Sequence, residues 1–226
     1  MTGIVLMGDP RIAAIPMNEC GDELVDTRQL VGLESTPDEN PQNSTYAFLR
    51  LSVAQRLLHA QETLPRGFRL LIAEGYRPYE QQDFYFNRRE RRLMDADPTL
   101  SKEAASLRTS EFVSPPQIAP HVSGAAVDLT IIDEDGHALD MGTAIDATPE
   151  QSNQACYFAA DNISAKARLN RTILATALSS AGLINYPTEW WHWSYGDRYW
   201  AFITRQPQAV FGPIHTGSDG QARPKP

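Results

Sequence analysis

The apolar residues of this 226-residue chain occur in short runs, and 16 prolines and 14 glycines are spread between and around them. The longest candidate runs, such as residues 70–73, are only long enough for part of a strand. A helix needs about 18 apolar residues in succession to cross a bilayer. We therefore expect no membrane-spanning helix and no membrane partner. Short elements joined by turns are expected instead.

Helical and extended patterns alternate along the chain, which is typical of the α+β class. The hydrophobic spacing and the capping residues predict helices at residues 43 or 44 to 63, from 78 onward, 101–112, and from 161 or 162 to 181. Strands are expected at residues 69–74, 125–132, 137–141 and 183–195. Asp135-Gly136 should form a hairpin turn, and Gly182 should follow the last helix as its C′ residue. These elements predict a small antiparallel sheet flanked by helices.

The length suits a single domain, which we place at residues 1–205. The first 42 residues are rich in turn formers and are expected to wrap a core that later segments build. Residues 206–226 are dense in proline and glycine, which predicts a loose C-terminal tail.

Charge and cysteine content exclude several classes of protein. Twenty Lys and Arg against 28 Asp and Glu give a net charge of −8, which disfavours a nucleic-acid partner. The arginines of residues 88–92 surround Glu90 and are expected to form a solvated face of a helix without a function of its own. Cys20 and Cys156 match neither a disulfide framework nor a cysteine metal site. The first residues lack a signal pattern, so we expect a cytoplasmic protein, whose oligomeric state the sequence does not set.

His121 and Asp128 lie at the two ends of the segment HVSGAAVD. In a strand over residues 125–132, alternation turns Asp128 away from the apolar face. The flexible Gly124 allows the chain to bend and to bring the imidazole near the carboxylate. An imidazole and a carboxylate are two of the three protein ligands that a catalytic zinc site requires. The alternative is an ordinary surface histidine and an aspartate at the end of a strand.

A second histidine lies among aromatic residues in the segment EWWHWSY, residues 189–195. Strand alternation places three of these aromatic side chains toward the core and His192 on the opposite side, where it can be the third ligand. Glu189 can share this site only from a bend after Pro187. A carboxylate there, not itself a ligand, could take a proton from water at the open zinc position. The alternative is a packed aromatic strand with a satisfied histidine.

Taken together, these segments resemble the zinc peptidases grouped around D-Ala-D-Ala metallopeptidases, lysostaphin-type enzymes and hedgehog domains. The pattern HxxGxAxD at residues 121–128, followed by ExxH at 189–192, carries this resemblance. Two more segments, EGYRP at 74–78 and MGTAID at 141–146, narrow it to the D-alanyl-D-alanine dipeptidases of the vancomycin-resistance type. The resemblance implies an α+β fold in which the sheet carries a zinc site.

Site residues follow from the same resemblance. It implies one zinc ion per chain, held by His121, Asp128 and His192, with Glu189 as the catalytic base. It also implies that Arg77 stabilises the oxyanion, a role that suits a permanently charged group with several donors at the end of a strand.

Two of the implied roles have plain structural alternatives. Arg77 could instead form a salt bridge with Glu74 or Glu80. Asp146 is implied to help bind the substrate's free amino group, but a loop aspartate can equally cap a turn.

The chain departs from the family at two places. Ala119 stands where the family has a serine that helps to bind the substrate's amino terminus, and Ser123 is the neighbour that could replace that hydroxyl. Residues 26–30 replace a family stretch that carries a tyrosine. Neither departure touches the zinc chemistry, but both affect the choice of substrate.

The expected function is therefore a zinc-dependent dipeptidase that hydrolyses D-Ala-D-Ala or a similar short D,D-dipeptide, which would be its small-molecule partner. One alternative is a carboxypeptidase or endopeptidase that acts on cell-wall peptides with the same site. Another is a noncatalytic zinc-binding module, against which the presence of both Glu189 and Arg77 argues.

Overall fold

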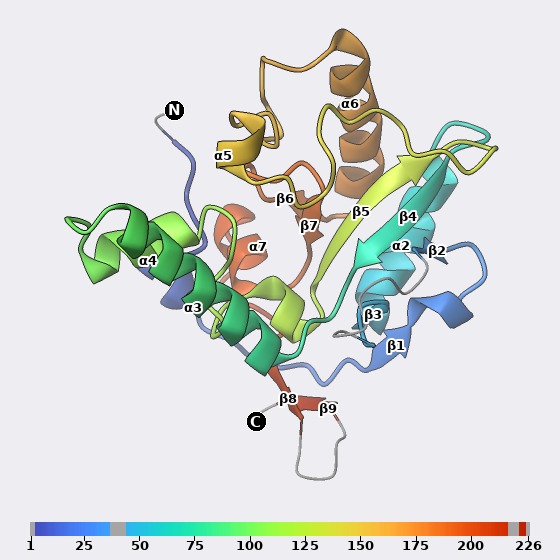
Figure 1. The fold of residues 1–226 in the computed structure, drawn as a ribbon. Helices are drawn as coiled ribbons and strands as arrows, with labels where there is room; N and C mark the ends of the chain where they lie inside the picture. The colour runs from blue at the N-terminus through green and yellow to red at the C-terminus, as the bar shows by residue number, and fades with distance from the viewer. Residues whose placement is uncertain (1–2, 37–43, 217–221, 225–226) are drawn as a thin grey trace. The chain divides into compact units, whose positions relative to one another are not determined.

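Five strands form the main sheet, in the order β2-β4-β5-β7-β6. Their bounds are β2 Glu34–Ser35, β4 Arg69–Glu74, β5 Ala126–Ile132, β6 Ile184–Asn185 and β7 His192–Ser194. Figure 1 shows β4 and β5 side by side as the long strands of this sheet. All the neighbouring pairs are antiparallel except β2 and β4, which are parallel. The predicted α+β class is confirmed, and the parallel edge strand is an addition that the sequence did not predict.

The computed structural model of the protein describes residues 3–36, 44–216 and 222–224. The chain divides into two units, each of them compact. The first, here called the sheet unit, consists of Asp22–Tyr76 and Ala125–Tyr195. The second, the helical unit, consists of Met1–Gly21, Arg77–Gly124 and Gly196–Pro226.

Helices and a second pair of strands complete the sheet unit. They are β1 Leu24–Asp26, the 3-10 helix η1 Thr27–Gln29, β3 Phe48–Arg50, α2 Leu51–Thr63, α5 Pro149–Ser152 and α6 Ala165–Ser180. Strands β1 and β3 pair in antiparallel fashion. Helix α2 buries Val53, Leu57 and Ala60, which recur at helical spacing, and it packs against α6. The apolar stripe that predicted this helix is therefore its buried face.

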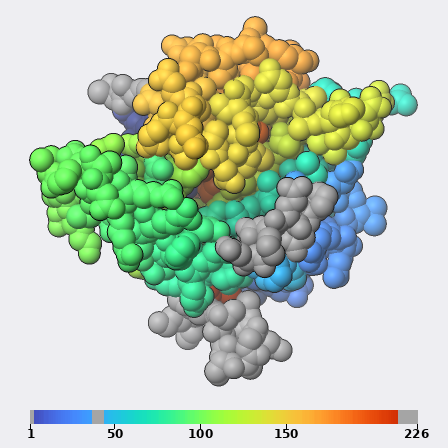
Figure 2. Space-filling model, in the orientation of Figure 1, coloured from blue at the N-terminus to red at the C-terminus, as the bar shows by residue number. Residues whose placement is uncertain are grey.

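The helical unit is built from short elements around two longer helices. They are α1 Pro10–Ala13, α3 Tyr79–Ala96, α4 Lys102–Thr109, the 3-10 helix η2 Pro120–Ser123, α7 Arg198–Ile203, β8 Ile214–Thr216 and β9 Ala222–Pro224. Helix α3, green in Figure 2, exposes Arg88, Arg91 and Arg92, as expected of a solvated face. No helix among the described residues is long and apolar enough to cross a bilayer.

Part of the segment that was expected to be a loose tail is packed within the helical unit. Ala209, Phe211 and Ile214 are buried, and Ala209 forms a β-bridge with Met17. Residues 217–221 and 225–226 of that segment lie outside the described residues.

Two helices begin later than the sequence predicted. The helix expected from residue 43 or 44 starts at Leu51, because Phe48–Arg50 pairs with β1 as a strand, and residue 43 lies outside the described residues. The helix expected from residue 161 or 162 starts at Ala165, because the Ser164 hydroxyl accepts the N–H of Ala167 as the N-cap. Gly182 follows this helix with a φ of 83°, as predicted for its C′ position.

Two of the predicted strands are also wrong in extent. The returning strand expected at residues 137–141 is reduced to one bridge between Ile132 and Ala138, although the hairpin turn before it is present. The strand expected at 183–195 is split into β6 and β7. A turn interrupts it, in which the N–H of Tyr186 donates to the carbonyl of His192 at 3.0 Å.

A buried arginine connects α6 to two irregular segments of the sheet unit. Arg171 is 1% exposed, and its guanidinium donates to the carbonyls of Met141, Ala155 and Tyr157 at 2.8, 2.7 and 2.6 Å, and to that of Phe158 at 3.3 Å. Burial lowers the pKa of Arg171 to about 10, which leaves it charged at neutral pH. One cation thus supplies charged donors to four carbonyl groups of these irregular segments.

We predict that Arg171→Met lowers the free energy of unfolding by at least about 3 kcal/mol, because several carbonyls lose a charged donor together. Arg168→Met is the matched control on the same helix, since Arg168 is exposed and donates to the carbonyls of Ala160 and Asp161. The control should change stability by less than about 1 kcal/mol. Denaturant unfolding measures both variants, and equal effects would contradict the role assigned to Arg171.

Candidate metal and catalytic site

Asp128 and His192 are brought together by the pairing of β5 with β7. The two residues are direct partners in the antiparallel register of these strands. His192 Nδ1 lies 3.0 Å from Asp128 Oδ1, and the two side chains are 4% and 5% exposed. A carboxylate and an imidazole at this depth require polar partners, and here they provide them for each other. The sheet therefore fixes a buried oxygen donor beside a nitrogen donor.

Glu189 lies on the turn between β6 and β7. The predicted bend after Pro187 is present, and the N–H of Glu189 donates to the carbonyl of Tyr186 at 2.9 Å. The Glu189 carboxylate is buried, and its Oε2 atom lies 3.8 Å from His192 Nδ1. The turn thus places a second carboxylate next to the Asp128–His192 pair.

His121 lies on η2, seven residues before Asp128, and its side chain is buried. Gly124 ends η2 in the left-handed conformation, with a φ of 68°, immediately before the chain enters β5. Glycine adopts this conformation without the strain that a Cβ atom would cause. His121, Asp128 and His192 form one group that could hold a metal ion, because each of them offers one ligand atom.

Three buried tryptophans pack around the turn and β7. Trp190, Trp191 and Trp193 are each no more than 2% exposed. The simple alternation expected of a strand is wrong at Trp190, because the strand begins only at residue 192 and the ring packs edge-on against Trp191 with 5.5 Å between centroids. The indole N–H of Trp190 donates to Thr143 Oγ1 at 2.8 Å, which ties the 141–146 segment to the turn.

Arg77 lies in the helical unit, just before α3. Its Nη1 donates to Gln82 Oε1 at 2.7 Å, and Gln82 is buried and donates from Nε2 to the carbonyl of Ser114 at 2.7 Å. The backbone N–H of Arg77 donates to the carbonyl of His121 at 3.2 Å. One hydrogen-bond partner of the Arg77 guanidinium is therefore a neutral amide.

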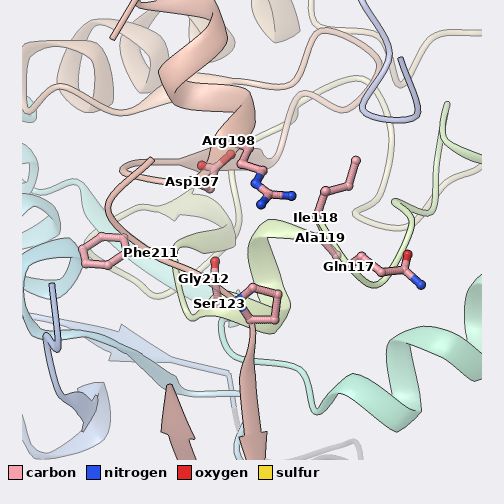
Figure 3. Close-up of a pocket in the computed structure, with 9 residues that line it drawn as sticks. Gln117, Ile118, Ala119, Ser123, Asp197, Arg198, Phe211 and Gly212 are labelled. Atoms are coloured by element: carbon pink, nitrogen blue, oxygen red, sulfur yellow. The ribbon is translucent and has the colours of Figure 1, made fainter. Parts of the chain in front are cut away.

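The residues expected to bind substrate have different environments. Asp146 is exposed on a turn of the sheet unit, with a φ of 63°. Ser123 is buried in the helical unit, where its hydroxyl donates to the carbonyl of Pro120 at 2.7 Å. Ala119 and Ser123 both line a small pocket of the helical unit, together with Asp197 (Figure 3). The hydroxyl of Ser123 thus lies in the neighbourhood of Ala119.

Another group of possible metal ligands lies on the hairpin after β5. Asp133, Asp135 and His137 could offer one ligand atom each, but Asp135 and His137 are exposed. Asp133 Oδ1 also accepts the backbone N–H groups of Asp135 and His137, at 3.1 and 2.8 Å, as in an ordinary turn. Because acidic turns are common without a metal, we assign no function to this group.

Sequence reasoning missed the amide side chains that hold the site residues in place. Gln82 contacts Arg77, and Asn185 donates to the backbone of the turn that carries Glu189. Neither residue stands out in composition or periodicity, because asparagine and glutamine lie mostly on protein surfaces and a buried one has no sequence pattern of its own. The tertiary contacts alone identify them.

Comparison with known proteins places most of the chain in one family. A profile of the family described as D-ala-D-ala dipeptidase matches residues 38–209. A D-alanyl-D-alanine dipeptidase of Synechocystis sp. is 28% identical over 228 residues, which cover 85% of this chain and 90% of that protein. A D-alanyl-D-alanine dipeptidase of Escherichia coli is 28% identical over 126 residues, which cover 56% of this chain and 54% of that protein.

Among solved structures, the LdcB LD-carboxypeptidase aligns with 85% of this chain and 76% of its own, at 19% identity and a TM-score of 0.45. The match to the family profile covers well over half of the chain and includes every residue singled out above as a possible ligand or catalytic group. Family membership therefore rests on the profile.

Proposed function

The chain belongs to the D-Ala-D-Ala dipeptidase family and is a peptidase, and from this we propose that it is a zinc-dependent dipeptidase that hydrolyses D-Ala-D-Ala or a similar short D,D-dipeptide. The observation that carries the proposal is the buried Asp128–His192 pair with Glu189 beside it. We take residues 1–205 as one peptidase domain, which the family match through residues 38–209 supports. The cytoplasmic location and the absence of a nucleic-acid partner remain predictions from the sequence.

The donor set fits zinc. His121, Asp128 and His192 offer two imidazole nitrogens and one carboxylate oxygen, the ligand types that catalytic zinc sites combine while they keep one position open. Burial of all three side chains favours a bound cation over open solvation. When bound, zinc supplies Lewis acidity, which makes water more acidic and a carbonyl carbon more electrophilic.

Glu189 is the residue placed to move the proton. Its carboxylate takes a proton from the attacking water as the new C–O bond forms, and it passes that proton to the departing amine as the peptide C–N bond breaks. While the water attacks, Arg77 stabilises the negative charge that develops on the carbonyl oxygen, because it is permanently charged and bears several donors. The hydrogen bond from Arg77 to the Gln82 amide orients the guanidinium and does not alter its charge.

Recognition of the substrate's amino terminus is assigned to Asp146, with Ser123 in place of the missing hydroxyl at Ala119. An exposed carboxylate can pair with an ammonium group, and the shared pocket of Ala119 and Ser123 supports the substitution. The change at Ala119 also favours the second candidate, a carboxypeptidase or endopeptidase that acts on longer cell-wall peptides. Such an enzyme would not need to bind a free amino terminus.

The metal assignment predicts that His192→Ala lowers bound zinc from about one ion per chain to well below one and abolishes hydrolysis. His137→Ala is the control, because His137 is an exposed histidine of the same unit. Metal analysis after gel filtration and a dipeptide assay measure both variants. Full activity of the parent enzyme after exhaustive chelation would rule out a zinc mechanism.

The role of Glu189 is separated from metal binding by Glu189→Gln, which keeps the shape of the side chain but cannot accept the proton. We expect turnover to fall at least ~10²-fold while the zinc content stays near normal. Glu62→Gln, at an exposed position of α2, should leave both unchanged. If Glu189→Gln loses its zinc, Glu189 is a ligand and not the base.

Substrate recognition is tested with free and N-acetylated D-Ala-D-Ala. Asp146→Asn should lower kcat/KM for the free dipeptide by roughly 10- to 150-fold and spare the acetylated one, since a hydrogen bond to a charged group contributes about 1.5–3 kcal/mol. Ala119→Ser should raise kcat/KM for the free dipeptide, and Asp135→Asn is the exposed control. Equal cleavage of both substrates, unaffected by Asp146→Asn, would favour the carboxypeptidase or endopeptidase.

A further inference from the structure

One amide side chain reaches three carbonyl groups of the turn that carries Glu189. Asn185, in β6, donates from Nδ2 to the carbonyls of Glu189 at 2.8 Å and of His192 at 3.0 Å. The carbonyl of Trp190 lies 3.5 Å from the same nitrogen. Asn185 thereby connects the end of β6 to Glu189 on the turn and to His192 at the start of β7.

The orientation of this amide is determined by its surroundings. A carbonyl oxygen can only accept a hydrogen bond, so the NH₂ end of the Asn185 amide must face the turn, and its two hydrogens serve the two nearest carbonyls. An aspartate of the same shape would present only acceptors at neutral pH. An aliphatic residue would leave the carbonyls of Glu189 and His192 without this donor.

The hydrogen bonds from Asn185 to the carbonyls of Glu189 and His192, here called the clamp, restrain the distance between these two residues. Backbone bonds close the turn at its two ends, from the N–H of Tyr186 to His192 O and from the N–H of Glu189 to Tyr186 O. A third backbone bond, from the N–H of His192 to Glu189 O at 3.4 Å, joins the two residues directly, and the half-buried Asn185 amide donates to the carbonyls of the same two residues. Without it, the Glu189 carboxylate could shift relative to His192 Nδ1, from which it now lies 3.8 Å.

We propose that Asn185 is a positioning residue, which sets the placement of Glu189 relative to His192 by clamping their backbone carbonyls. The inference rests on the proposed function of the site, because it assigns Asn185 a role in the turnover that Glu189 supports. A misplacement of about 1 Å can cost on the order of 10²-fold in rate.

The test compares Asn185→Leu and Asn185→Asp with Gln61→Leu. Gln61 is a matched control, because its half-buried amide also clamps backbone, donating to the carbonyl of Phe68 and accepting the N–H of Leu70. The full-length zinc-loaded enzymes are assayed for kcat, KM and zinc content on D-Ala-D-Ala. Hydrogen–deuterium exchange of residues 186–192 is measured in parallel, and it does not depend on activity.

We expect both Asn185 variants to lose roughly 10- to 100-fold in kcat with KM and zinc content close to those of the parent, and to exchange faster at residues 186–192. Gln61→Leu should lower thermal stability but keep kcat and the exchange of that segment. The proposal is overturned if kcat and exchange stay unchanged in the Asn185 variants, if Gln61→Leu loses as much kcat, or if the Asn185 variants lose zinc. If the parent enzyme hydrolyses no dipeptide, the proposed function fails, and the exchange data alone decide whether the clamp exists.

Discussion

The contact between Asp128 and His192 is the interaction on which the rest of the site depends. It joins a carboxylate and an imidazole that are almost fully buried, 3.0 Å apart, on paired strands. Because side chains alternate along a strand, a slip of one residue between β5 and β7 would turn one of them to the other face. The register between β5 and β7 therefore decides whether the chain has a site at all.

The irregular segments around this pair are held by side-chain donors in addition to backbone hydrogen bonds. Arg171 satisfies the carbonyls of two loops from α6, and Asn185 satisfies those of the turn that carries Glu189. Buried carbonyls outside helices and sheets need such donors, since an unsatisfied one costs about 1–3 kcal/mol. Glu189 can therefore lie on an irregular turn, outside β7, and still be held next to His192.

The sequence predicted those strands and turns that depend on local patterns of residues. The bounds of β4, the position of β5 to within one residue and the bend before Glu189 follow from apolar runs, glycine and proline. The break between β6 and β7 did not, because it depends on hydrogen bonds from Asn185 and Tyr186 that no periodicity shows. The late start of α2 has a similar cause, since pairing with β1 overrides the helical pattern at Phe48.

The central claim is that the metal binds where β5 and β7 present their buried donors. Crystals of the zinc-loaded protein, measured at the zinc absorption edge, locate the ion directly. We predict one strong anomalous peak within about 2.2 Å of a ligand atom of both Asp128 and His192. A peak only at the exposed hairpin of Asp133 and His137, with none at Asp128 and His192, would contradict the account.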